Sequence, residues 1–456
     1  MTVARELGEF LTRTSPTDLP EQAVEHAAML IASTLASAAL GSGLQSAKII
    51  RDLAQERGGR PEASLWFHAG PKLPITAAAQ ANSVASDAAA SDDSDLRNIV
   101  HAGTTLVATS LAVAERTRAN GQDILTAMVL GYEAAGRIGE AITPGFRNGG
   151  FHGCLIAIFA GAVAAARLLR LDTAGMTRAL ALSATSIGGL AAAANTSVAR
   201  EYHAGLAAML GVDAALAAQR GFQTEERIFE TRHGFFEVYG GVEGAAGGAS
   251  VTRDLGQSWD IVTDMAIKLA PGGHPHHALA EAAANAARDG RITPDEVESI
   301  TLSRPDVTAL AGPRHPTDLI GMAHSPAYFL ATGVADYGFS WIHATPAKIT
   351  DPVIHRLIDK VHVGAPPTDN VARYRQGATV TIRTTEGRSS TSTVYVPRGA
   401  GMVGIAWTDI DAKYRALVPE AGLPDRQVEA SLEVIHDFRQ VTNVSALTDL
   451  LQPKEV

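Results

Sequence analysis

The sequence contains few charged residues, few aromatic residues and a single cysteine. Of its 456 residues, 19% are charged and 5% are aromatic, whereas 46% are hydrophobic. This balance predicts a folded chain with a large core and excludes a disordered protein. The single cysteine, Cys154, excludes an intramolecular disulfide framework and a zinc site built on cysteines. It also argues against an iron–sulfur cluster, which needs several thiolates.

An excess of positive charge is also missing, since the formal net charge is −10. This excludes a nucleic-acid partner, because phosphate binding needs a basic surface. A small anionic substrate remains possible, since a few arginines can reverse the field inside a cleft. The N-terminus has no apolar segment of the signal-peptide kind, and the apolar run at 154–166 is too short to span a bilayer. We therefore expect a cytoplasmic protein that does not contact a membrane.

The chain is rich in alanine-containing segments with helical spacing and Gly, Asn or Asp at their ends. Such segments predict closely packed buried helices and a subunit interface. The predicted helices of the first half cover 20–40, 104–118, 123–142, 153–170, 173–193 and 203–220.

The pattern changes after about residue 240. The glycine-rich stretch 240–250 reads as a connector, and strands are expected at 297–304 and 360–366, with a β-hairpin at 378–397. Helical patterns at 277–288 and 325–336 lie between them, and the C-terminal tail is helical again. The sequence therefore predicts a mainly α protein. A large all-helical domain (1–263 and 401–456) carries an inserted smaller α+β domain (264–400).

The acidic stretch 91–103, "SDDSDLRNIVHAG", is the first candidate for chemistry. It could be a polar loop that caps the next helix. It could instead present His101, with Asp92 or Asp93, to a cleft, where the histidine would serve as general acid or base. A helix start also favours a bound anion.

Two further helix starts repeat this arrangement. His152 follows a glycine pair and precedes a long apolar segment, and Arg200 and His203 come just before another one. A histidine at a helix start is often structural, but Arg200 has the forked geometry that clamps a carboxylate.

Candidates in the second half are less distinctive. The histidines at 274–277 are poorly placed to converge on a metal, so we expect no metal site there. Lys268 and Tyr328 fit a packing role or a catalytic one.

Taken together, these blocks resemble the MmgE/PrpD family of 2-methylcitrate dehydratase, cis-aconitate decarboxylase and iminodisuccinate epimerase. "SDDS…HAGTTLVATSLAVAE" is similar to its Asp-Asp-Thr and His-Pro-Gly block, and "GFHGCLIAIFAGAVAAARLLRLD" to its Gly-x-His-x-x-Gly helix. "AREYHAGLAAMLGVDAALAAQRGF", "KLAPGGHPHHA", "HSPAYFLATGVADYG" and "DPVIHRLIDKVHV" resemble its later blocks in the same order.

The resemblance implies a helical domain with an inserted α+β lid, a homodimer, no metal and no organic cofactor. It implies a site for small di- or tricarboxylates, where a proton is removed beside a carboxylate. Carried over by position, the site comprises Asp93, Ser94, His101, His152, Arg200, His203, Lys268, His274, His277 and Tyr328. His101, His152, Asp93, Lys268 and Tyr328 would be catalytic, and the others would bind substrate.

Five positions depart from the family pattern, and the loop before His101 is one residue longer. Asp87 and Ala90 stand where a histidine and an aspartate are expected, Ser94 replaces a threonine, Arg200 replaces a lysine, and His274 replaces an arginine. The expected activity is a cofactor-independent lyase of the dehydratase or decarboxylase type. The alternatives are an isomerase or epimerase that uses the same proton abstraction, and a non-catalytic carboxylate-binding homologue.

Overall fold

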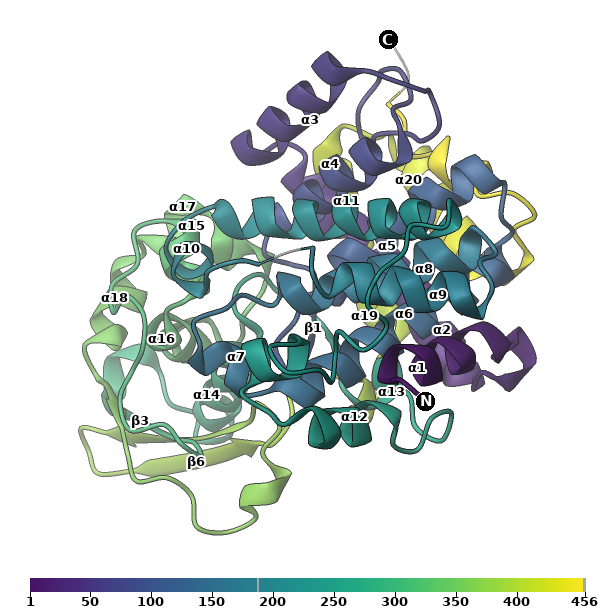
Figure 1. The fold of residues 1–456 in the computed structure, drawn as a ribbon. Coiled ribbons are helices and arrows are strands. Elements are labelled where there is room, and N and C mark those ends of the chain that lie inside the picture. Colours follow the sequence, from purple (N-terminus) through teal and green to yellow (C-terminus); the bar gives the residue numbers. More distant parts are fainter. Residues whose placement is uncertain (187, 454–456) are drawn as a thin grey trace. The chain divides into compact units, whose positions relative to one another are not determined.

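The computed structural model describes residues 1–186 and 188–453, and it is mainly helical (Figure 1). The chain forms two compact units, which are described separately. Unit 1 comprises Met1–Ile267 and the C-terminal segment that begins at Ala406, and unit 2 comprises Lys268–Ile405.

The helices of unit 1 are α1 (Val3–Arg13), α2 (Glu21–Gly41), α3 (Gln45–Arg57), α4 (Ile75–Ala88), α5 (Ala102–Thr117), α6 (Gly121–Ile142), α7 (Gly145–Asn148), α8 (Cys154–Leu168), α9 (Thr173–Ser183), α10 (Ala191–Thr196), α11 (Ala199–Gln219), α12 (Gly244–Thr252), α13 (Asp260–Thr263), α19 (Trp407–Leu417), α20 (Asp425–His436) and α21 (Ser445–Thr448). Helix α8 lies at the centre of this unit and packs against α5, α6, α9 and α11. Every residue of α8 except Arg167 is buried, because its small and aliphatic side chains allow close packing on all sides.

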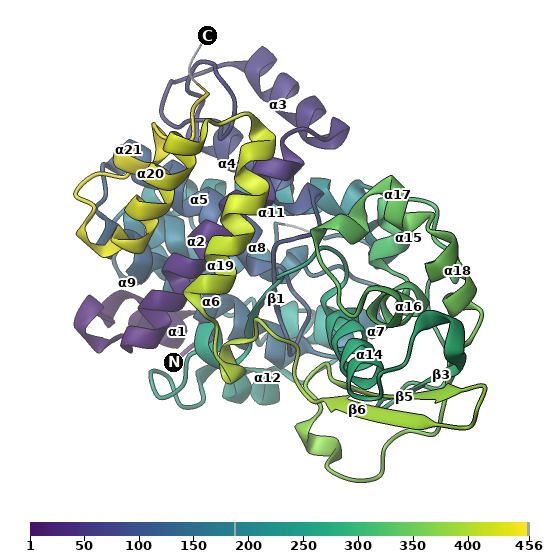
Figure 2. The same cartoon turned by 180° about the vertical axis from the view of Figure 1, so that it is seen from behind.

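The C-terminal helices return to the N-terminal part of unit 1. Helix α19 packs on α2, as the yellow and purple ribbons show in Figure 2. The Lys413 ammonium donates to Ser33 Oγ at 2.8 Å and also to the carbonyl of Ser91. The second contact attaches α19 to the first residue of the acidic stretch 91–103. The end of the chain therefore helps to hold that stretch in place.

Unit 2 combines a small sheet with helices. Its four-stranded sheet has the order β4 (Val361–Val363), β3 (Val297–Ser303), β5 (Ala378–Thr384), β6 (Ser389–Val394). β3 and β4 are parallel, and the other neighbours are antiparallel. Its helices are α14 (His277–Asp289), α15 (Leu319–Ala323), α16 (Pro326–Asp336), α17 (Pro346–Ile349) and α18 (Pro352–Ile358). Helix α14 packs on β5 and β6, and α16 packs on α14 and α18.

Most predicted elements are present, and three expectations need correction. The segment 173–193 is not one helix, since α9 ends at Ser183 and α10 begins at Ala191. The glycine-rich stretch 240–250 is not only a connector, because it contributes most of α12. Unit 1 is not all helical, because β1 (Asp93–Asp95) pairs with β2 (Met265–Ile267). Strands of three residues are too short to produce a recognisable alternation of apolar residues.

One described helix, α2, is long and apolar enough by length and composition to cross a membrane. Of its apolar window, 89% is buried inside the protein, and this pattern is the one expected of a core helix. The sequence predicted this segment as a buried helix at 20–40, and the structure confirms it. As a possible membrane span only the uninterrupted apolar run at 154–166 stood out, because Glu25, His26, Ser33 and Thr34 interrupt the apolar residues of α2.

Candidate active site

The acidic stretch 91–103 is buried and is anchored by strand pairing. Asp93, Ser94 and Asp95 pair with Ile267, Ala266 and Met265 in antiparallel register. The side chains from Ser91 to Asp95 are almost completely buried. Charged groups buried to this extent need specific partners, and those partners organise the site.

Asp93 caps helix α5 from outside the helix. Its Oδ1 accepts the backbone N–H of Gly103 at 2.8 Å, and its Oδ2 accepts the Tyr132 hydroxyl at 3.0 Å. A Cβ on residue 103 would lie 2.4 Å from Asp93 Oδ1, so this approach requires glycine. Burial, and then the neighbouring charge of Asp92, raises the pKa of Asp93 to about 6. Asp93 can therefore change protonation state near neutral pH.

His101 is the residue before α5, and its Nδ1 points into the acidic stretch. This nitrogen lies 2.6 Å from Asp92 Oδ2 and 2.7 Å from the carbonyl oxygen of Asp93. Ser94 Oγ lies 3.4 Å from the same nitrogen. The carboxylate and the carbonyl only accept hydrogen bonds, so Nδ1 carries a proton. The neutral ring then has its lone pair on Nε2, which is the tautomer that a base acting through Nε2 requires.

Arg200 lies in the first turn of α11, which begins at Ala199, so Arg200 and His203 are inside this helix and not ahead of it as the sequence predicted. Its Nε donates to Asp87 Oδ2 and its Nη2 donates to the Asp87 carbonyl, both at 2.7 Å. Burial alone would lower the pKa of Arg200, but the carboxylates of Asp87 and Asp92 outweigh it and the net shift is upward. A fixed, permanently charged guanidinium results, and this group suits carboxylate binding.

His152 and His203 face each other across the start of α8. Their Nδ1 atoms are 3.3 Å apart and their ring centroids 5.1 Å apart. Burial, and then the electrostatic influence of His101, His203 and Arg200, lowers the pKa of His152 to about 3. Because these groups influence one another electrostatically, they lie close together. They form one cluster within unit 1, made up of His101, His152, His203 and Arg200. His152 is neutral there and acts as a hydrogen-bonding group rather than as a cation.

Lys268, His274 and His277 belong to unit 2. The side chains of Lys268 and His274 are buried. The His277 ring lies 4.8 Å from that of His274, measured between centroids, and stacks on Phe329 at 5.8 Å. His277 also lines a cavity of about 400 Å³, to which Glu281 contributes. The proposed roles of the three residues stay predictions.

Tyr328, also in unit 2, is completely buried in the core of that unit. Its hydroxyl donates to the His343 carbonyl at 2.9 Å, and burial raises its pKa above the ordinary tyrosine value. This environment is typical of a core tyrosine, so the catalytic role of Tyr328 stays a prediction.

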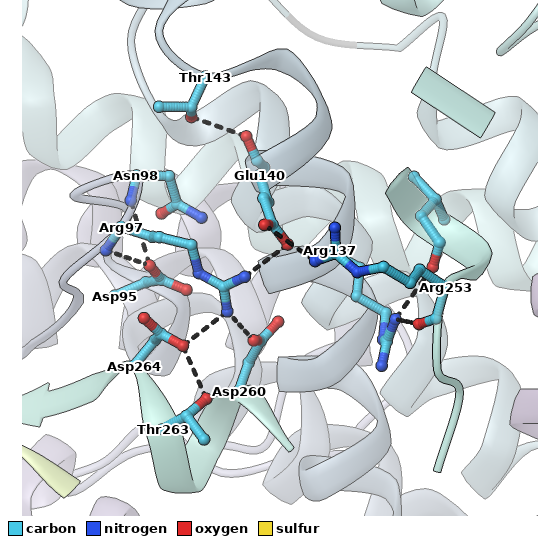
Figure 3. Close-up of polar contacts among 12 residues, drawn as sticks. Asp95, Arg97, Asn98, Arg137, Glu140, Thr143, Arg253, Asp260, Thr263 and Asp264 are labelled. Carbon is cyan, nitrogen blue, oxygen red and sulfur yellow. Dashed lines mark hydrogen bonds and ion pairs between the residues drawn. The ribbon is translucent and has the colours of Figure 1, made fainter. Parts of the chain in front are cut away.

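A buried charge cluster beside the acidic stretch was not foreseen (Figure 3). The Arg97 guanidinium is bound by Glu140, Asp260 and Asp264. Burial alone would lower the pKa of Arg97, but these carboxylates outweigh it and raise it. The sequence holds no signal for this cluster, because Arg97, Glu140 and the Asp260/Asp264 pair come from three separate segments.

Asp95, which lies next to this cluster, anchors the backbone just ahead of His101. Asp95 Oδ1 accepts the N–H groups of Arg97 at 2.7 Å and Asn98 at 3.1 Å. The Asp95 N–H donates to the carbonyl of Val100 at 2.9 Å. Ile99 has φ of 55°, a conformation that a β-branched residue rarely adopts. These hydrogen bonds therefore hold the turn before His101 in a strained backbone conformation. In the sequence, Asp95 and Asn98 were the residues that indicated a turn here.

Comparisons with known proteins match almost the whole chain. The family model of the MmgE/PrpD N-terminal domain matches residues 5–246, and that of the MmgE/PrpD C-terminal domain matches residues 271–437. The chain is 25% identical to a cis-aconitate decarboxylase of Homo sapiens, over 96% of this chain and 92% of the human protein. It is 25% identical to a cis-aconitate decarboxylase-like protein of Aspergillus oryzae, over 87% of this chain and 86% of that protein. A cis-aconitate decarboxylase of Aspergillus terreus is 29% identical over 59% of this chain and 56% of its own length.

Proposed function

Because the chain belongs to the MmgE/PrpD family, we propose that it is a cofactor-independent lyase acting on a small di- or tricarboxylate. The observation that carries the proposal is the cluster of His101, His152, His203 and Arg200 in unit 1. It combines a fixed cation for a carboxylate with an oriented imidazole for proton exchange. The relatives that are cis-aconitate decarboxylases support a lyase of the decarboxylase type.

Arg200 provides the binding charge for a substrate carboxylate. Asp87 holds its Nε and Nη2, so the guanidinium is oriented before substrate arrives. A positive charge fixed in this way also stabilises the enediolate-like intermediate that forms next to a carboxylate. The resemblance adds Lys268, His274 and His277 as further binding groups, and their roles are part of the proposal.

His101 exchanges the proton. Its Nδ1 is occupied by Asp92 and the carbonyl of Asp93, so Nε2 is the nitrogen that would face the substrate. Asp92 stabilises the imidazolium that forms when Nε2 takes up a proton. His152 remains neutral beside it and donates or accepts a hydrogen bond without adding a second positive charge.

Decarboxylation fits the described residues better than dehydration does. Loss of CO₂ leaves an electron pair on the substrate, and a proton that His101 Nε2 has first taken up from solvent completes the reaction. Loss of water needs an additional acid to protonate the departing hydroxyl. The Tyr328 hydroxyl, which the resemblance suggests for that task, already donates to the His343 carbonyl in the core of unit 2.

The experiment is a screen of di- and tricarboxylates, cis-aconitate among them. A thermal-shift assay with the purified protein finds the ligands, and a turnover assay with chelator present follows. We expect stabilisation by at least one of the acids and release of CO₂ from it. Binding without any product would support a non-catalytic homologue, and activity that chelators abolish would contradict cofactor independence. The homodimer that the resemblance implies is tested on the same sample by its mass in solution.

A further inference from the structure

Within residues 1–186 and 188–453, one group of three metal-ligating side chains converges, formed by His152, Cys154 and His203. The donor atoms of the three side chains all lie within 4.8 Å of one another. Cys154 is the first residue of α8, His152 lies two residues before it, and His203 comes from α11. Two separate segments of unit 1 therefore bring two imidazoles and a thiol to one point.

We propose that His152, Cys154 and His203 form a binding site for a divalent transition-metal ion of the zinc class. Zinc binds imidazole nitrogen at ~2.0–2.1 Å in tetrahedral geometry, which places two such nitrogens ~3.3–3.4 Å apart. The Nδ1 atoms of His152 and His203 are 3.3 Å apart. The spacing of the two imidazoles thus matches one edge of a zinc tetrahedron, and the thiol supplies the soft third donor.

Gly189 leaves the donor atoms uncovered on one side. A Cβ at this residue would lie 2.6 Å from Cys154 Sγ and 3.1 Å from His203 Nδ1. Any other residue would thus fill the space beside both atoms. The Gly189 carbonyl accepts the N–H of His152 at 2.8 Å, which fixes the glycine in this place. His152 and His203 are partly exposed, which gives an ion access to the donors.

An ion bound here would meet two neutral imidazoles and would have to displace the proton of the thiol. Burial lowers the pKa values of His152 and His203, so both rings are neutral at neutral pH and offer lone pairs. Burial raises the pKa of the Cys154 thiol to about 12, so the free site carries no thiolate. A bound metal ion deprotonates a coordinating thiol, and each ion would therefore release one proton to solvent.

Three protein ligands leave the fourth position of a zinc tetrahedron open for water or an anion. An ion bound here would engage two of the histidines assigned to the carboxylate site and would therefore inhibit turnover. This consequence, unlike the site itself, rests on the proposed function.

The test uses Co²⁺ as a spectroscopic substitute for Zn²⁺. Metal-free full-length protein is titrated with Co²⁺ at neutral pH, and absorption is recorded in the near ultraviolet and the visible. A thiolate ligand gives a charge-transfer band, and tetrahedral cobalt gives intense visible bands. We expect both to saturate at one ion per chain and to disappear when Zn²⁺ is added. Neither readout requires lyase activity, so failure of this site and failure of the proposed function are distinguishable.

Variants locate the site. Cys154→Ser is expected to abolish the charge-transfer band, and His203→Gln to weaken Co²⁺ binding by at least about tenfold, since even outer-shell changes cost this much. His355→Gln is the matched control, because His355 pairs with His315 at the surface of unit 2 and its loss should leave the band unchanged. Circular dichroism checks that each variant is folded, and Cys154→Ala replaces Cys154→Ser if that variant is not. Absence of the band in the wild-type protein, or its persistence in the cysteine variants, would overturn the proposal.

Discussion

The Nδ1 atom of His101 lies 2.6 Å from Oδ2 of Asp92, whose side chain is 1% exposed. A buried carboxylate at this distance fixes the orientation of the ring and the position of its Nδ1 proton. Asp92 in turn contributes to the electrostatic environment of Arg200. One carboxylate thus links the residue proposed to move the proton with the residue proposed to bind the substrate.

His101→Gln is expected to lower kcat by about 10²–10⁴-fold, the usual contribution of one general acid or base. The amide keeps a hydrogen-bonding group beside Asp92 but cannot exchange the proton. Steady-state kinetics on the carboxylate found by the screen measure the effect. His362→Gln is the control, since His362 is exposed on β4. Turnover of His101→Gln equal to that of the control would remove His101 from the mechanism.

The Arg200–Asp87 pair predicts a loss of substrate affinity. Arg200→Met alone would leave Asp87 buried and unpaired, so the informative variant is Arg200→Met/Asp87→Asn, which removes both charges. Losing one charge-assisted contact costs about 1.5–3 kcal/mol, so KM should rise about 10–100-fold. Asp87→Asn alone leaves the guanidinium in place and serves as the comparison. An unchanged KM in the double variant would show that Arg200 does not hold the substrate.

The raised pKa of Asp93 predicts how the free energy of unfolding depends on pH. Its pKa is about 6 in the folded protein and about 3.9 when unfolded. The folded state therefore binds more protons between pH 4 and 6, so stability falls as the pH rises through this window, by roughly 2 kcal/mol. Asp93→Asn lacks this titration. The unfolding free energy of the variant minus that of the wild type should become more positive by that amount from pH 4 to pH 7.

Urea unfolding at several pH values measures this difference, because titrations common to both proteins cancel in the subtraction. A difference that stays constant, or that changes in the opposite direction, would show that the folded protein does not raise the pKa of Asp93.

Arg97 is the central cation of the cluster in Figure 3, and its removal should destabilise unit 1 strongly. In Arg97→Met, Asp260 and Asp264 stay buried but lose their cation. Breaking a buried ion pair in this way lowers the free energy of unfolding by about 3–5 kcal/mol. Arg253→Met is the matched control, since the Arg253 side chain is 59% exposed and pairs with the same Glu140. That exposed pair is worth at most about 1 kcal/mol. Equal melting temperatures for the two variants would contradict the structural role of Arg97.

The helical fold could be predicted from the sequence because its signals are local. Helices α2, α5, α6 and α8 begin and end within a few residues of the predicted limits, since alanine-rich spacing and Gly or Asn ends act within a turn. The β1–β2 pair could not be predicted, because it joins Asp93–Asp95 to residues of a distant segment and is only three residues long.

The candidate site also contains residues that the sequence indicated and contacts that it did not. His101, His152 and Arg200 were recognisable because each lies at a helix start within a family block. Their partners were not: the family comparison marked Asp87 only as a departure from the pattern, and it is the ion-pair partner of Arg200. Cys154 was considered only as a lone cysteine, and its proximity to His203 depends on the packing of α8 against α11. Contacts between distant segments leave no local pattern in the sequence.

The most direct test of the proposed lyase is the reaction itself, carried out in D₂O with chelator-treated protein and cis-aconitate, and with the other acids that the thermal-shift screen finds. Proton NMR and mass spectrometry follow the product. The proposal predicts a product lighter by one CO₂ that carries deuterium at the carbon where the proton is delivered, with both signals lost in His101→Gln. Deuterium exchange without loss of CO₂ or water would identify an isomerase or epimerase instead, and an unchanged substrate would contradict catalysis altogether.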